Sequence, residues 1–328
     1  MKINRILAVL GLALAGVVSL HAQPAAVQQF QNLQLSQQQQ TILTNLATGK
    51  AAPELYQGEN VDVGRQRILR LNPRPLYFDV LFDSQVFYTD NANFAQDPAM
   101  IGSTVFVNTL QAAIAPPDFR LGAGKVSLTA GLASQWYNYE NNRMVPLDFD
   151  AQTAFLGGRY SVGKWQVGFT VDYTRLVSQS DYSATYRELL PVLTLQRVFA
   201  LNDKMLVALG NQADYHFSDT DSAFGVRSDI NDRFDDALDL TFSWQVTPQL
   251  IFQPYYRFQY SYYRFNTEQT SDRNDYLQTA GVTVAYYFNS VASLRVFFNY
   301  SRKQSNDPFT PAYLEFSGGL GASLNFKF

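Results

Sequence analysis

The segment Ala312-Tyr-Leu-Glu-Phe-Ser-Gly-Gly-Leu-Gly-Ala-Ser-Leu-Asn-Phe-Lys-Phe328 alternates strictly between two kinds of side chain. One set is apolar and mostly large: Leu314, Phe316, Leu320, Ala322, Leu324, Phe326 and Phe328. The other set is small or polar: Glu315, Ser317, Gly319, Gly321, Ser323, Asn325 and Lys327. A period of two residues predicts a β-strand with one set on each face. The side chains of the polar face are too small to cover a protein surface, so we expect the apolar face to point outward.

A strand that is apolar outside and small and polar inside suits a barrel that stands in a membrane. In this alternation and in its final Phe328, the chain resembles the outer-membrane β-barrels of Gram-negative bacteria. The resemblance implies an outer-membrane location, with outer-membrane lipid and lipopolysaccharide around the barrel. It also implies that the barrel-assembly machinery recognises the C-terminal strand.

The first residues have the pattern of a cleaved signal peptide. Lys2 and Arg5 precede an apolar run at residues 6–18, which is too short to span a membrane as a helix. Ala22 offers a small residue before the cut. We therefore divide the chain into a signal peptide (1–22), a periplasmic glutamine-rich segment (23–75) and a barrel (76–328).

The composition excludes several classes of protein. The chain has no cysteine, which excludes disulfide frameworks, thiolate metal sites and lipoprotein anchoring. Charged residues make up 16% of the chain, against about 25% in soluble domains. The net charge of −3 argues against a nucleic-acid partner. Nothing in the sequence calls for a cofactor or a metal.

The rest of the chain repeats the strand pattern. We predict twelve antiparallel strands, within a range of ten to fourteen, at residues 76–88, 104–115, 125–139, 152–161, 165–176, 187–199, 204–217, 236–246, 249–263, 276–288, 292–301 and 313–328. Long polar connections alternate with short turns such as Thr247-Pro248, which is typical of outer-membrane barrels whose short turns lie in the periplasm. Both termini would then lie in the periplasm, which requires an even number of strands.

Aromatic residues cluster at the ends of the predicted strands, on the outward face. They form two belts at the level of the lipid headgroups, where amphipathic rings are favoured. The candidates for these belts are Trp136, Trp165, Trp244, Tyr173, Tyr262, Tyr300 and Phe328. A soluble sandwich or propeller with an aromatic core would explain neither these positions nor the last strand.

The segment 23–75 has no strand alternation and contains Gln37-Gln38-Gln39-Gln40. A solvated periplasmic tail, a plug inside the barrel and a helix that binds a partner or a second copy are all compatible with it. The sequence also leaves open whether the barrel is a monomer or a homo-oligomer.

The alternation places charged side chains on the inward face. The candidates for lining the lumen are Asp79, Asp83, Arg159, Asp172, Asp214, Asp239, Arg257, Arg295 and Glu315. Twelve strands lie between barrels that side chains fill and barrels that leave an aqueous channel. We therefore predict a passive, porin-like channel for small polar solutes and no enzyme activity. A structural or adhesive surface barrel with a packed lumen is the alternative, since a polar lining fits both.

His216 is the one histidine after the signal peptide, and it points inward near the outer rim. A hydrolase built around His216 is a third hypothesis. The acidic stretch from Asp219 to Asp236 starts like a calcium loop but lacks the acidic residues at its fifth and closing positions, so we expect a solvated loop. Basic residues at the outer rim are candidates for contacts with anionic lipid heads: Arg264, Arg273, Arg302 and Lys303.

Overall fold

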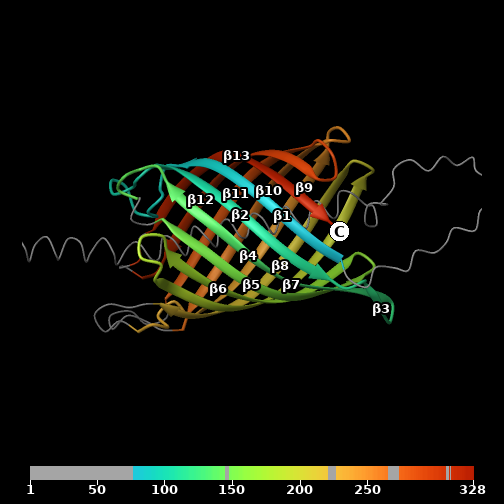
Figure 1. Ribbon diagram of the computed structural model, residues 1–328, viewed down its shortest axis with the longest axis horizontal. Coiled ribbons are helices and arrows are strands. Elements are labelled where there is room, and N and C mark those ends of the chain that lie inside the picture. Colours follow the sequence, from blue (N-terminus) through green and yellow to red (C-terminus); the bar gives the residue numbers. More distant parts are fainter. Residues whose placement is uncertain (1–76, 145–147, 221–226, 265–272, 308–309, 311) are drawn as a thin grey trace, which may run out of the picture.

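A computed structural model of the 328-residue chain describes residues 77–144, 148–220, 227–264, 273–307, 310 and 312–328. The predicted signal peptide and the glutamine-rich segment 23–75 lie outside these residues. The described residues form thirteen strands in one antiparallel sheet (Figure 1). The strands are β1 (Tyr77–Thr89), β2 (Ser103–Ala115), β3 (Phe119–Leu121), β4 (Gly124–Tyr139), β5 (Phe149–Val162), β6 (Trp165–Ser178), β7 (Ala184–Asn202), β8 (Met205–Thr220), β9 (Arg233–Gln245), β10 (Leu250–Tyr263), β11 (Asn274–Tyr287), β12 (Ala292–Ser305) and β13 (Tyr313–Lys327).

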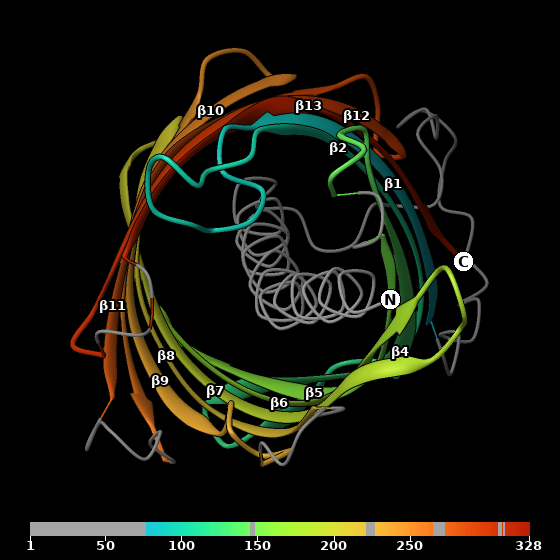
Figure 2. The same ribbon diagram turned by 90° about the vertical axis from the view of Figure 1, so that its left-hand side faces the viewer.

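The sheet closes on itself. The first strand pairs with the last, from Asp79 opposite Lys327 to Thr89 opposite Ser317. β2 pairs with β4 on its other side, so each of twelve strands has two neighbours. Figure 2 shows the resulting ring of strands end-on. Closure gives each of these twelve strands a partner on both sides, which is the condition for a sheet to stand in lipid.

The prediction of a twelve-stranded antiparallel barrel is confirmed. The short β3 is additional: it pairs with the start of β4, inside the connection predicted as a turn at 116–124. Several strands extend further than predicted at the end of the barrel with the long connections. β8 continues to Thr220, β9 begins at Arg233 and β12 continues to Ser305. We call this the outer end, and the end with the short turns the inner end.

The two faces of the sheet differ as the alternation predicts. In β13, Leu314, Phe316 and Leu320 are about half exposed on the outside, whereas Glu315 and Ser317 are buried on the inside. Large exposed apolar side chains continue on the outward positions of the other strands, for example Leu132 in β4, Leu156 in β5 and Leu238 in β9. A closed sheet with an apolar exterior and a polar interior is a β-barrel of the outer-membrane class. Among the described residues, no helix is long and apolar enough to cross a membrane.

Candidate functional site

All nine candidates for the lumen lining occupy inward positions of their strands. Six of them are buried: Asp83, Asp172, Asp214, Arg257, Arg295 and Glu315. The other three, Asp79, Arg159 and Asp239, are partly exposed on the same face. The structure brings four of the nine together as two ion pairs, and the other five make no ion pair with one another within the described residues.

The first pair joins Arg295 on β12 to Asp83 on β1. Both terminal nitrogens of the guanidinium donate to the carboxylate, at 2.5 and 2.7 Å. The pair passes over β13, where the Ser323 hydroxyl accepts from Arg295 at 2.8 Å and donates to Asp83. The second pair is local: Arg257 Nη1 on β10 lies 2.8 and 3.1 Å from the two carboxylate oxygens of Asp239 on β9. Both arginines therefore lie along the wall.

Glycines beneath these side chains explain why they can lie flat. A Cβ on Gly321 would come within 2.7 Å of the guanidinium carbon of Arg295. In the same way, Tyr255 crosses Gly281 and its hydroxyl donates to Asn299 at 2.6 Å. The absence of a side chain at these two positions leaves the room in which the larger neighbour rests against the sheet.

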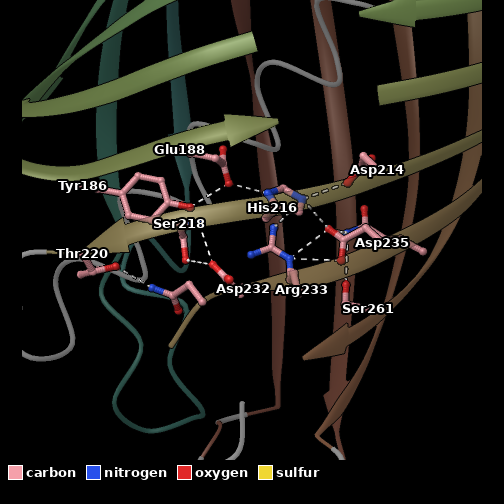
Figure 3. Close-up of polar contacts among 12 residues, drawn as sticks. Tyr186, Glu188, Asp214, His216, Ser218, Thr220, Asp232, Arg233, Asp235 and Ser261 are labelled. Atoms are coloured by element: carbon pink, nitrogen blue, oxygen red, sulfur yellow. Dashed lines mark hydrogen bonds and ion pairs between the residues drawn. The ribbon is translucent and has the colours of Figure 1, made fainter. Parts of the chain in front are cut away.

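A third cluster lies at the outer end, across β7 to β10 (Figure 3), and it is centred on His216. The Nδ1 atom of His216 contacts the carboxylate of Glu188, which also accepts from the Tyr186 hydroxyl at 2.7 Å. The Nε2 atom lies 3.0 Å from Asp235 Oδ2. Both ring nitrogens therefore face carboxylates, which suits an imidazolium that donates to Glu188 and Asp235.

The carboxylates of this cluster are held by further polar groups. Arg233 donates through Nε to both oxygens of Asp235, at 3.1 and 3.0 Å, and Gln259 donates to Asp235 at 2.8 Å. Asp214 accepts from Gln212 at 2.7 Å through one oxygen. Its other oxygen lies 2.9 Å from His216 Nε2 but has no hydrogen-bond geometry with any described partner. Three carboxylates thus share one buried site with His216 and Arg233.

The lumen candidates did not include five buried charged residues at the outer end: Glu188, Arg233, Asp235, Asp275 and Lys303. Arg233, Asp235, Asp275 and Lys303 fall in stretches that we predicted as loops, although the strands continue through them. Their alternation with outward residues such as Phe234 was the available signal. Glu188 lies in β7, where the inward Leu190 and Val192 blur the alternation.

Two expectations for the outer rim are wrong. Asp232 and Asp235 are buried in the barrel wall rather than solvated, because they accept from Ser218, Arg233 and Gln259. Arg273 and Lys303 do not point to lipid heads either. Both bind the buried Asp275, at 2.6 and 2.9 Å. A buried carboxylate requires such partners, and the two basic side chains supply them. Arg302, by contrast, is exposed on the outward face.

The geometry around His216 does not fit a hydrolase. A general base must reach the hydroxyl that it activates, yet the two ring nitrogens face the carboxylates of Glu188 and Asp235. The Ser218 hydroxyl donates instead to Asp232, at 3.0 Å. Asp214, His216 and Asp235 could hold a metal ion, since three of their ligand atoms lie within 4.8 Å of one another. The Arg233 guanidinium, 3.2 Å from Nε2, already supplies positive charge there.

The connection between β1 and β2, residues 90–102, lies within the ring of strands at the outer end (Figure 2). The Asn91 amide anchors it to the wall by donating to the carbonyl of Leu314 at 2.8 Å. The Phe94 ring packs on Tyr313, with ring centroids 5.0 Å apart. We predicted this connection only as a long polar loop, because its inward course depends on these contacts with β13. It narrows the outer mouth.

Beside the charged cluster, part of the outer mouth is apolar. Tyr137 stacks on Phe149 at 4.3 Å between ring centroids, and Met144 and Ala92 from two connections are buried beside them. The Tyr139 N–H donates to the Asp148 carboxylate at 2.9 Å, in the connection before β5. Burial raises the pKa of Asp148, and this hydrogen bond opposes the rise. A small apolar core therefore adjoins the charged cluster at the mouth, and Tyr186 belongs to both.

The candidates for the aromatic belts lie on the outward face. Most are exposed there: Trp165, Trp244, Tyr173, Tyr262, Tyr300 and Phe328. Trp136 is half-buried on the same face. Trp165 and Trp244 are at the inner ends of β6 and β9, and Tyr262 is at the outer end of β10.

No protein-family profile and no curated protein sequence matches the chain. Three solved structures illustrate its structural similarities. The β-domain of the Bordetella autotransporter BrkA is 13% identical with a TM-score of 0.45, over 77% of this chain and 100% of that one. An outer membrane channel from Pseudomonas putida F1 is 16% identical with a TM-score of 0.49, over 81% and 100%. The KdgM porin is 10% identical with a TM-score of 0.38, over 75% and 99%.

These three proteins are outer-membrane barrels. The present chain is also one. Its class follows from its own closed sheet, its apolar outer face and its polar inner face.

Proposed function

We propose that this barrel is a passive, porin-like channel for small polar solutes. The observation that carries the proposal is the way in which large inward side chains lie along the wall. Arg295 lies over Gly321 and binds Asp83, and Tyr255 lies over Gly281. Side chains that rest on the sheet occupy less of the lumen than side chains that project into it.

The polar lining supports the same proposal. Paired charges and amides cover the inward face from Asp83 near the middle of the wall to the His216 cluster at the outer end. Such groups replace part of the water around a polar solute as it passes. The connection 90–102 would set the width of the mouth, because it lies within the ring of strands at the outer end.

A packed surface barrel is the second candidate, and the apolar core around Tyr137 and Phe149 favours it. In that case the long outer connections would bind a partner and the lumen would carry nothing.

The deciding experiment is single-channel recording from the refolded mature protein in a planar lipid bilayer, after heat-modifiable migration on a gel has shown that the barrel is folded. A channel gives discrete and reproducible conductance steps. Electrical silence from a folded barrel would contradict the channel and leave the packed barrel.

The route to the membrane belongs to the same proposal. Residues 1–22 would direct export and be removed, and segment 23–75 would remain in the periplasm. The alternating strand β13 would be recognised by the barrel-assembly machinery, and lipopolysaccharide would surround the outer end. N-terminal sequencing of the protein recovered from outer membranes tests the cleavage site.

A further inference from the structure

Arg197 is a cation on the lipid-facing side of the barrel. It occupies an outward position of β7, on the same face as the exposed Leu193 and Leu195 and close to the inner end. Its guanidinium carbon lies 4.9 Å from the ring centroid of Trp165 on β6 and 4.8 Å from that of Phe199. These distances are within the range of cation–π contacts.

The guanidinium has five N–H donors. Within the described residues the Arg197 side chain makes no ion pair and no hydrogen bond, and its Nε is buried without a partner. Two other arginines on the outward face behave differently. Arg187, on the same strand at the outer end, pairs with Asp219 at 3.2 Å, and Arg175 donates to Gln152 at 2.6 Å. Donors of a cation beside lipid need an acceptor, and at Arg197 the protein offers none.

Lysines lie in the two turns of the inner end that flank β7. The carbonyl of Lys164, in the turn between β5 and β6, accepts from the Val198 N–H at 3.3 Å, which places this turn beside Arg197. Lys204 lies in the next turn of the inner end, next to Asp203. Both lysines are exposed. An anion at Arg197 would therefore lie near the turn that carries Lys164, whereas the charge of Lys204 is offset by Asp203 beside it.

We propose that Arg197, held between Trp165 and Phe199, binds the phosphate of a glycerophospholipid in the leaflet at the inner end of the barrel. The two rings fix the guanidinium, and its two terminal nitrogens match two oxygens of a phosphate. Tryptophan beside the cation sets the depth of the site at the headgroup level. The site does not depend on whether the lumen conducts.

The test is native mass spectrometry of the full-length mature protein in detergent, with phosphatidylglycerol added in steps. We expect the wild-type barrel to retain one lipid. Arg197→Gln should raise the dissociation constant for that lipid about tenfold, the effect of losing one charge-assisted hydrogen-bonding group. Arg187→Gln is the matched control, since it removes an outward arginine from the same strand, and it should change the constant less than about twofold.

Two further measurements keep the proposal falsifiable. Arg197→Lys retains the charge without the fork, so we expect an intermediate affinity; it also serves if Arg197→Gln does not fold. In a Trp136→Phe, Trp244→Phe background, brominated phosphatidylglycerol should quench Trp165 less after Arg197→Gln. Equal affinity in wild type, Arg197→Gln and Arg197→Lys would overturn the site. Tighter retention of lipid A than of phosphatidylglycerol would overturn the choice of lipid.

Discussion

Asp83 and Arg295 form an ion pair over the strand that separates them, with both guanidinium nitrogens on one carboxylate at 2.5 and 2.7 Å. Closure of the barrel makes this possible, because β1 and β12 flank β13 although the two residues are far apart in the sequence. The pair therefore exists only in the closed sheet. The pair lies where the first and last strands meet, and it also determines part of the charge of the lumen.

Removing one partner of this ion pair should lower the stability of the barrel and change its ion selectivity. Asp83→Asn leaves the Arg295 cation without its partner, and breaking such a buried pair costs about 3–5 kcal/mol of the free energy of unfolding. We expect a lower urea midpoint in lipid vesicles and a shift of ion selectivity toward anions. The double variant Asp83→Asn, Arg295→Gln should recover most of the selectivity. If the double variant is as anion-selective as Asp83→Asn, the pair does not set the lumen charge.

Glu315 should contribute to cation selectivity. It is buried on the inward face, accepts from the Thr89 hydroxyl at 2.9 Å and makes no ion pair within the described residues. One unit charge acting over about 10 Å of water is worth ~0.4 kcal/mol, or about a factor of two in permeability. We expect Glu315→Gln to lower the ratio of potassium to chloride permeability about twofold, as measured from reversal potentials.

The matched control for Glu315 is Asp219→Asn, which removes an exposed carboxylate on the outward face that is paired with Arg187. It should leave the reversal potential unchanged. An equal effect of both variants would indicate a surface charge rather than a charge in the lumen.

The connection 90–102 should limit conductance. Asn91→Ala removes the amide that donates to Leu314 and Ala95, both at 2.8 Å, so the connection loses its anchor on β13. We expect larger and noisier single-channel steps than in wild type. Asp181→Ala, in an exposed connection at the same end, is the control. Unchanged steps in Asn91→Ala would show that the connection does not obstruct the passage.

The His216 cluster should stabilise the outer end of the barrel. His216→Ala leaves Glu188, Asp214 and Asp235 close together with Arg233 as their remaining cation in the cluster. By analogy with other broken buried ion pairs, the loss should be about 3–5 kcal/mol of the free energy of unfolding. Urea titration in lipid vesicles measures it. A loss below about 1 kcal/mol, as for exposed pairs, would contradict a structural role.

The sequence could predict the strands because each has one lipid-facing side. Leu314, Phe316 and Leu320 must alternate with residues that avoid lipid, and the period of two follows. Inward positions follow from the same parity, which is why the nine lumen candidates lie on one face. Partners across strands depend on register and closure, which alternation does not contain. The pairs of Asp83 with Arg295 and of Glu188 with His216 were therefore beyond prediction.

The strand boundaries at the outer end were also hard to predict from the sequence. Arg233, Asp235 and Lys303 look like loop residues in the sequence, because charged side chains are rare in strands that face lipid. Their side chains face the interior, where carboxylates and cations neutralise one another. A rule that assigns charged residues to loops therefore fails where the charged side chains face the interior of the barrel and neutralise one another.

Gly321 should be required for the position of Arg295. A Cβ at this site would approach the guanidinium carbon to 2.7 Å, closer than real contacts allow, so Gly321→Val must push Arg295 away from the sheet. The displaced side chain projects into the lumen and loses Asp83. We expect a smaller single-channel conductance together with the shift toward anions that Asp83→Asn produces.

Gly210 provides the matched control for this last variant. It also occupies an inward position, on β8, but the nearest atom to its Cβ would be Asp239 Cβ at 3.5 Å, an ordinary contact. Gly210→Ala should therefore leave the conductance near that of wild type, whereas Gly321→Ala already strains the contact with Arg295. If Gly321→Val conducts like wild type, Arg295 does not lie along the wall of an open lumen. The observation that carries the channel proposal would then be lost, even if the barrel still folds.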